Sequence, residues 1–295
     1  MCIAPRGRAL TVPASSNIPA TAHAYLAPAK LNLDLRIVGR RPDGYHLLES
    51  VFTLIALYDR LWLQPNPEGQ IRLHTPTAGV LPEHDLCCRA AHSLQAAVHS
   101  KQGVDIWLEK HIPMGGGLGG GSSDAALMLM ALNQLWQCGL NRQQLINLGV
   151  HLGADVPFFV FGEPAFARGI GEVLTPITVP LQWYVIIKPA VHVSTAVVFD
   201  HGGLTRDSEA SIMPVFQTPQ SCRNDMQAVV LFEYPEVKSA FDVLARYGEP
   251  MMTGSGACVF LRFANETAAR KVYQDIFPTH QAYCVAGLNR HPFYA

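Results

Sequence analysis

The segment that most constrains this chain is PMGGGLGGGSSDAALMLMAL, residues 113–132, in which six of the seven positions from Gly115 to Gly121 are glycine. Two serines and a long apolar run follow these glycines. Ordering glycine costs more conformational entropy than ordering any other residue, so a merely flexible loop would be wasteful beside a buried helix. The order strand, glycine loop, serine and helix predicts an anion site at a helix N-terminus. The alternative is a tight connection that needs positive φ angles.

The helix that follows the glycines has recognisable start signals. We expect Ser122 or Ser123 to be its N-cap, and Asp124 to fall in the first turn, where the helix dipole favours negative charge. The helix should run to about Trp136 and be buried, because it is apolar almost all round. A second helix should begin at Asn141.

The residues alone do not decide which phosphate-binding motif this is. A P-loop carries Lys-Ser/Thr after its last glycine, and this loop does not. Gly115, Gly117 and Gly120 satisfy GxGxxG, but so glycine-rich a run satisfies it almost automatically. A dinucleotide site also needs an acidic residue about 20 positions later, and no Asp or Glu occurs between Asp124 and Asp155. A nicotinamide-dependent oxidoreductase is therefore the weaker interpretation.

Composition limits the remaining classes. The chain has 295 residues, 49% hydrophobic and 15% charged, with a net charge of −1, which indicates two globular domains. Without a basic excess or a Lys/Arg run, neither nucleic acid nor a membrane surface is an expected partner. Seven cysteines without a CxxC pair favour a reducing compartment, and no segment resembles a signal peptide or membrane span. We expect a cytoplasmic protein.

Strand and helix patterns alternate along the chain. Residues 25–38 place Leu and Ile on one side and Lys30, Asn32 and Asp34 on the other, which predicts a half-buried strand. Further strand-like segments are 47–57, 71–74, 104–108, 156–162, 164–177, 183–188, 257–263 and 281–286; helical ones are 85–100, 225–247, 266–276 and a segment after Ser194. This alternation predicts an α+β sandwich. We expect a flexible extension (1–21) and two domains, 22–178 and 179–295.

Several blocks resemble the GHMP small-molecule kinases. PMGGGLGGGSSDAA is similar to the family's second motif, in which this loop and helix wrap the triphosphate of ATP. PAKLNLDLRIVGRRPDGYH (28–46) resembles the first motif, and LGADVPFFVFGEPAFARGIGEVLTPI (152–177), KPAVHVSTAVVF (188–199) and TGSGACVF (253–260) resemble later blocks. The resemblance implies an N-terminal domain like the second domain of ribosomal protein S5, a ferredoxin-like C-terminal domain, and an active site between them.

The DGYH form of the first motif points to the members of this family that act on a cytidine diphosphate-linked substrate. The resemblance therefore implies ATP-dependent phosphorylation of the 2-hydroxyl of a cytidine diphosphate-linked methylerythritol, in the non-mevalonate route to isoprenoid precursors, with ATP and Mg²⁺. A mevalonate-type or homoserine-type GHMP kinase is the alternative. A nucleotide-binding module without catalysis is a third possibility, which the retention of Lys30 and Asp155 opposes.

The resemblance also implies roles for individual residues. Lys30 and Asp155 would be catalytic: the ammonium would stabilise developing negative charge, and the carboxylate would accept the proton of the acceptor hydroxyl. The two side chains should meet across the cleft. Without the resemblance, Lys30 would be interpreted as a surface lysine and Asp155 as a turn residue.

Binding residues implied in the same way fall into two groups. The substrate group is Asn32, Tyr45, His46, Phe199, Gly254 and Ser255, with Tyr45 and Phe199 stacking on the cytosine and His46 bonding to its edge. The ATP group is Lys110, Pro113, Met114, Gly115, Gly116, Gly117, Leu118, Gly119, Gly120, Gly121, Ser122 and Ser123. No acidic cluster identifies a dedicated metal ligand, so the triphosphate with Ser122, Ser123 or Asp155 would hold Mg²⁺.

Overall fold

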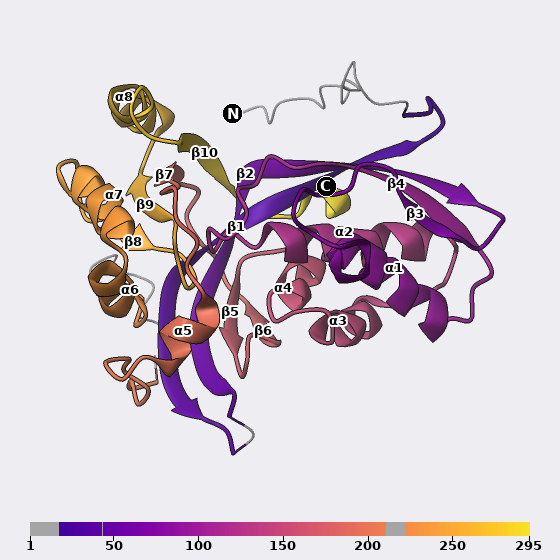
Figure 1. Cartoon of the computed structure of the whole chain (residues 1–295), viewed down its shortest axis with the longest axis horizontal. Helices are drawn as coiled ribbons and strands as arrows, with labels where there is room; N and C mark the ends of the chain where they lie inside the picture. The colour runs from indigo at the N-terminus through magenta and orange to yellow at the C-terminus, as the bar shows by residue number, and fades with distance from the viewer. Residues whose placement is uncertain (1–17, 43, 211–221) are drawn as a thin grey trace.

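A long antiparallel hairpin runs through the centre of the fold (Figure 1). The structure, a computed structural model, describes residues 18–42, 44–210 and 222–295. The strands of the hairpin are β1 (His23–Arg40) and β2 (His46–Asn66), paired along nearly their whole length. The turn between them is closed by bonds from Arg41 N to Tyr45 O (2.7 Å) and from Gly44 N to Arg41 O (2.9 Å). The strand predicted at 25–38 is therefore confirmed, whereas residues 1–17 of the expected extension lie outside the described residues.

All the other described strands join the same sheet as this hairpin, either by pairing with β2 or through a neighbouring strand. They are β3 (Ile71–Leu73), β4 (Gly103–Glu109), β5 (Ala165–Arg168), β6 (Val173–Pro176), β7 (Trp183–Ile187), β8 (Met251–Met252), β9 (Val259–Phe263) and β10 (Ala282–Leu288). The main path of the sheet is β3-β4-β2-β10-β7-β9-β8, with β5 and β6 joined to β2 through β5. β10 pairs with both β2 and β7, so it connects the two halves of the sheet. The division near residue 178 remains a prediction.

The helices form two groups, one on each half of the sheet (Figure 1). The first group is α1 (Leu86–Ala97), α2 (Gly120–Leu135), α3 (Arg142–Val150) and α4 (Val156–Phe161), whose apolar side chains share a core with β2 and β4. The second is α5 (Thr195–Asp200), α6 (Gln227–Glu233), α7 (Pro235–Ala245) and α8 (Glu266–Ile276), packed on β7 and β9. Short 3-10 turns are η1 (Pro82–His84) and η4 (Pro292–Tyr294). Within the described segments, no helix is long and apolar enough to cross a membrane.

The polar side of β1 differs from the expectation. Lys30, Asn32 and Asp34 are 2%, 2% and 4% exposed, so the strand is buried on both faces rather than one. The Leu face packs against β2 and β7 to β9, while Lys30, Asn32 and Asp34 on the polar face contact Asp155, Thr253 and Arg223 respectively. Burial of three polar side chains in a row requires that each has a partner, which is the first structural sign of a functional site.

The segment 156–162 was wrongly predicted as strand-like. It is α4, preceded by Asp155 and ended by Gly162, whose φ of +79° is left-handed. Five of its six residues, Val156 to Val160, are buried, so helical periodicity is invisible in the sequence. Pro157 in the first turn and the glycine at the end are the signals that mark it as a helix.

Two helix boundaries also differ from the prediction. Gly119, in the left-handed conformation, is the N-cap of α2, so Ser122 and Ser123 lie inside the helix and Asp124 comes after its first turn. The expected helix at 225–247 is two helices, α6 and α7, because Tyr234 is extended before Pro235.

Candidate active site

Two adjoining pockets lie where the glycine loop meets β1. The Lys30 pocket, of about 350 Å³, is walled by β1, β2, Asp155 and the segments 192–199 and 254–256. The glycine-loop pocket, of about 270 Å³, is lined by Leu86, Lys110 and residues 112–122. Gly115, Gly117 and Ser122 line both, so the two pockets share a wall.

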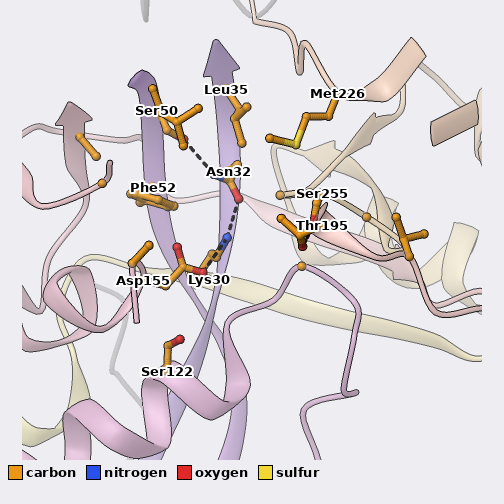
Figure 2. A pocket seen from close by; sticks show the side chains of 18 of the residues that line it. Lys30, Asn32, Leu35, Ser50, Phe52, Ser122, Asp155, Thr195, Met226 and Ser255 are labelled. Carbon is orange, nitrogen blue, oxygen red and sulfur yellow. Dashed lines mark hydrogen bonds and ion pairs between the residues drawn. The ribbon is translucent and has the colours of Figure 1, made fainter. Parts of the chain in front are cut away.

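Lys30 projects from β1 into the first of these pockets (Figure 2). Its Nζ donates to Asn32 Oδ1 at 2.6 Å, lies 3.4 Å from Asp155 Oδ2, and sits 5.1 Å from the centre of the Phe52 ring. The register of β1 against β2 shifts on both sides of this point, after Pro28 and after Asn32. Such irregularities re-aim side chains near functional sites. The predicted meeting of Lys30 and Asp155 is therefore observed.

Asn32 is held in a single orientation. Its Nδ2 donates to Ser50 Oγ at 2.8 Å, and Ser50 Oγ donates to the Asp34 carbonyl at 2.6 Å. The amide oxygen must consequently face Lys30, because the amide nitrogen is already used on the other side. This chain of bonds fixes the ammonium group as well as the amide.

Asp155 reaches the same place from the opposite wall of the pocket. It precedes α4 with helical φ and ψ angles of −86° and −15°, and within the described chain its carboxylate makes no capping bond to the helix. The side chain is 31% exposed and points toward Lys30 (Figure 2). One oxygen therefore faces an ammonium while the group remains open to a ligand.

The glycine loop is tied down at several points. The carbonyls of Gly115 and Gly116 accept bonds from Ala257 N (3.3 Å) and Cys258 N (3.2 Å). On the other side, the Leu118 carbonyl accepts from Lys30 N at 3.0 Å. The loop is therefore a fixed part of the site and not a flexible joint, as the sequence predicted.

Gly119 shows why a side chain is excluded from this loop. Its φ is +73°, and a Cβ there would lie 2.9 Å from the Phe159 ring and 3.1 Å from Lys30 Cγ. Both the backbone conformation and the space favour glycine. The loop can thus lie directly against the stem of Lys30, next to the N-terminus of α2.

Lys110 lies on the floor of the glycine-loop pocket between two carboxylates. Its Nζ pairs with Asp124 Oδ2 at 2.6 Å and with Asp59. Asp59 also accepts bonds from the backbone N–H groups of His111 and Ile112, so Asp59 is the better stabilised anion. Burial raises the pKa of Asp124 well above its usual range, although Lys110 opposes this shift. Burial also acts to lower the pKa of Lys110, but the pairing with both carboxylates outweighs it and raises that pKa.

Thr253 connects the two pockets, a role that no motif in the sequence predicted. It is fully buried; its Oγ1 accepts from Asn32 N at 3.0 Å and lies within hydrogen-bonding distance of Asn32 Oδ1 (3.2 Å) and the Gly117 carbonyl (3.3 Å). The only available signal was its place before Gly254 in the second glycine-rich turn. Asp59 was missed because it lies outside every quoted motif.

The aromatic residues proposed for the substrate are divided. His46 stacks on Phe199, with ring centres 4.5 Å apart and planes 12° apart, and burial is the main cause that lowers the pKa of His46. Phe199 lines the Lys30 pocket. The described residues that line this pocket include neither His46 nor Tyr45, and Tyr45 is 62% exposed.

Most of the other predicted residues lie on the pocket walls. Gly254 and Ser255 line the Lys30 pocket, where Ser255 Oγ is 2.7 Å from Thr195 Oγ1. The glycine-loop pocket contains the predicted ATP residues Lys110, Pro113, Met114, Gly115, Gly116, Gly117, Leu118, Gly119, Gly120, Gly121 and Ser122. Ser123 is the exception: it is fully buried and its hydroxyl donates to the Pro28 carbonyl at 2.6 Å. His192 and Thr195 line the Lys30 pocket and were not predicted.

The residues present fit a divalent cation carried mainly by phosphates. Among the described residues, no three His, Cys, Asp or Glu side chains form a cluster that could hold a metal. Mg²⁺ commonly keeps waters and takes only one or two protein oxygens besides substrate phosphates. Ser122 and Asp155, both on the wall of the Lys30 pocket, supply such oxygens.

Comparisons with known proteins agree with this geometry. Residues 85–163 match the GHMP kinases N terminal domain, and residues 217–280 match the GHMP kinases C terminal domain. The chain is 57% identical to the 4-diphosphocytidyl-2-C-methyl-D-erythritol kinase of Neisseria gonorrhoeae over 94% of this chain and 98% of the relative. It is 51% identical to the same-named enzyme of Chromobacterium violaceum, over 92% and 97% of the two chains.

Solved structures show the same fold. A crystal structure of 4-(cytidine 5'-diphospho)-2C-methyl-D-erythritol kinase superposes with a TM-score of 0.79 at 32% identity, covering 90% of this chain and 99% of that one. A mevalonate kinase shares the fold, with a TM-score of 0.67 at 15% identity over 91% of this chain and 100% of that one. With the sequence identities above, these matches show that the chain belongs to the 4-diphosphocytidyl-2-C-methyl-D-erythritol kinase family of the GHMP kinases.

Proposed function

We propose that this GHMP kinase transfers the γ-phosphoryl group of ATP to the 2-hydroxyl of 4-diphosphocytidyl-2-C-methyl-D-erythritol, with Lys30 and Asp155 as the catalytic pair. The observation that carries the proposal is the 3.4 Å contact between these two side chains at the junction of two pockets. The names of the relatives supply the acceptor. The reaction belongs to the non-mevalonate route to isoprenoid precursors, and we expect it to take place in the cytoplasm.

The two catalytic groups would have different roles at the acceptor hydroxyl. The carboxylate of Asp155 accepts the hydroxyl proton as the oxygen attacks. The ammonium of Lys30, fixed by Asn32, stabilises the negative charge on the attacking oxygen and the transferring group. Positioning and electrostatics account for such an in-line transfer without a covalent intermediate on the protein.

The glycine-loop pocket would hold the nucleotide. The first N–H groups of α2 have no partners within the helix, and its dipole is positive at this end, so the triphosphate can lie along residues 115–122. Bound Mg²⁺ would supply charge neutralisation for the β- and γ-phosphates, held by the phosphates with Ser122 or Asp155. Lys110 is engaged by two carboxylates, so it shapes the pocket more than it adds positive charge.

The Lys30 pocket would hold the cytidyl alcohol. The stacked pair His46–Phe199 offers an aromatic platform for the pyrimidine. Hydroxyls of Thr195 and Ser255 lie on the wall of this pocket and could donate to the substrate diphosphate. Tyr45 would have to close over the base to stack on it, because it is exposed.

A screen of acceptor alcohols with detection of ADP release tests this proposal. The purified chain, ATP and Mg²⁺ would be incubated with the cytidyl alcohol, mevalonate, homoserine or no acceptor. Turnover limited to the cytidyl alcohol is expected. Faster release of ADP with mevalonate or homoserine would replace the proposed acceptor, and equal rates with and without acceptors would refute the kinase assignment.

A further inference from the structure

The helix that presents Asp155 is fastened at its other end by a segment more than 120 residues away in the sequence. Tyr294 Oη donates to the Val160 carbonyl at 2.7 Å, and His291 N donates to the Gly162 carbonyl at 2.7 Å. The last carbonyls of a helix have no partners within the helix. Here η4 and its N-cap His291 supply partners at this end of α4.

The contact is closely fitted. Gly162, which ends α4, has a φ of +79°, and a Cβ there would lie 2.5 Å from the Tyr294 ring and 3.3 Å from His291 Cβ. The Arg142 guanidinium lies over the Tyr294 ring, 4.5 Å from its centre. The ring therefore contacts both the end of α4 and the start of α3.

The fastening segment is itself tied to β1. His291 is fully buried, and its Nδ1 accepts a bond from Phe293 N at 3.1 Å. The Phe293 ring lies 6.2 Å from the ring of Tyr25 in β1, the strand that also carries Lys30. One short segment thus contacts both elements that bear the catalytic pair.

We propose that residues 291–294 are a positioning clasp, which sets Asp155 relative to Lys30 by fixing the far end of α4. A helix of six residues is about 9 Å long and moves as one rod, so a displacement at Gly162 is carried to Asp155. A misplacement of about 1 Å can cost about 100-fold in rate. This inference rests on the proposed function only in taking Asp155 as the proton acceptor.

Two substitutions loosen the clasp from opposite sides. Tyr294→Phe removes the bond to Val160 and keeps the ring, while Gly162→Ala pushes the ring away. Tyr273→Phe, on α8, and Gly139→Ala are the matched controls; Gly139 has a φ of +72° and nothing within 4 Å of a new Cβ. Each variant would be assayed for kcat and both KM values, and for hydrogen exchange of the amides in residues 156–162.

For both clasp variants we expect faster hydrogen exchange in residues 156–162 and a kcat lowered about 5- to 100-fold, with KM values within about twofold of wild type. Neither control should show these changes. The double variant should lose no more than the worse single variant, because both break one contact. Exchange equal to that of the controls, or faster exchange with an unchanged kcat, would overturn the proposal. If the wild-type chain does not phosphorylate the cytidyl alcohol, the proposed function fails, whereas the exchange rates still decide whether the clasp holds α4.

Discussion

The two pockets are built in opposite ways. Apart from Leu86, the described residues that line the glycine-loop pocket come from one stretch, 110–122. The Lys30 pocket takes its walls from β1, β2, the glycine loop, residues 154–155, 167–171 and 192–199, Met226, and residues 254–256. A motif can therefore describe the first pocket, whereas only the folded chain brings the second together.

This difference predicts how the two pockets respond to substitution. In a pocket made from one segment, a substitution should mainly change the affinity for the ligand bound there. In a pocket assembled from distant segments, the effect depends on which segment is changed and on what connects it to the reacting atoms. The predictions below separate these cases.

The largest expected effect is that of Asp155→Asn. An amide cannot accept the hydroxyl proton, so kcat should fall by about 100- to 10,000-fold, while the KM for ATP stays near its wild-type value. Steady-state assays of ADP release measure both. Asp242→Asn, at an exposed ion pair on α7, is the control. A kcat close to wild type for Asp155→Asn would contradict the assignment of the proton acceptor.

Phe199→Ala should act on the acceptor alone. Base stacking on an aromatic ring contributes about 1–3 kcal/mol, so the KM for the cytidyl alcohol should rise by roughly 5- to 150-fold without a change in the KM for ATP. Phe232→Ala, at a ring that is 79% exposed on α6, serves as the control. An equal rise in both KM values would show that the pockets are not separable.

Thr253→Val should affect both pockets at once, because its hydroxyl contacts Asn32 and the Gly117 carbonyl. Loss of a buried hydrogen bond costs about 1 kcal/mol, and each KM should rise about fivefold, with a lower kcat. Thr253→Ser should restore both, since the hydroxyl remains, and exposed Thr205→Val should change neither. A change in only one KM would remove Thr253 as the connection.

Asp124→Asn should have the smallest effect, on stability. Burial raises the pKa of Asp124 in the folded chain above its usual value of 3.8, so the folded state binds more protons than the unfolded state once the pH exceeds that value. The free energy of unfolding of the wild type should then fall as the pH rises from about 4 to neutral. The variant lacks this titration, so its free energy of unfolding should rise relative to that of the wild type over that range.

Urea unfolding at several pH values measures this difference, with Asp242→Asn as the control. If the variant instead loses stability relative to the wild type as the pH rises, Asp124 and not Asp59 is the better stabilised anion beside Lys110.

Local patterns predicted much of the fold. The hairpin strands and β4 show alternation, and the helices predicted at 85–100, from Asn141 and at 266–276 are observed, capped by the side chains of Asp85, Asn141 and Asn265. The segment 156–161 failed because a helix buried all round shows no period. Ser122 and Ser123 failed as caps because Gly119, in the left-handed conformation, starts α2 one turn earlier.

The candidate site shows the same difference between residues with local sequence signals and residues whose partners are distant in the sequence. Lys110 and residues 113–122 were predicted together because they lie in one short stretch, and the Lys30–Asp155 contact was predicted because each residue lies in a motif. Asp59 and Thr253 were not predicted, since their partners are 51 and 221 residues away. The burial of the polar face of β1 was missed because Asp155, Thr253 and Arg223, which contact that face, come from distant segments of the chain.

The bonds between the glycine loop and residues 253–258 also set the electrical polarity of the nucleotide pocket. In a trans peptide the N–H points opposite to the C=O of the same unit. Because the carbonyls of Gly115, Gly116 and Gly117 face Ala257, Cys258 and Thr253, the N–H groups that follow each of them face the other way. A loop from the distant half of the chain thereby turns electronegative oxygens away and leaves an electropositive surface for an anion.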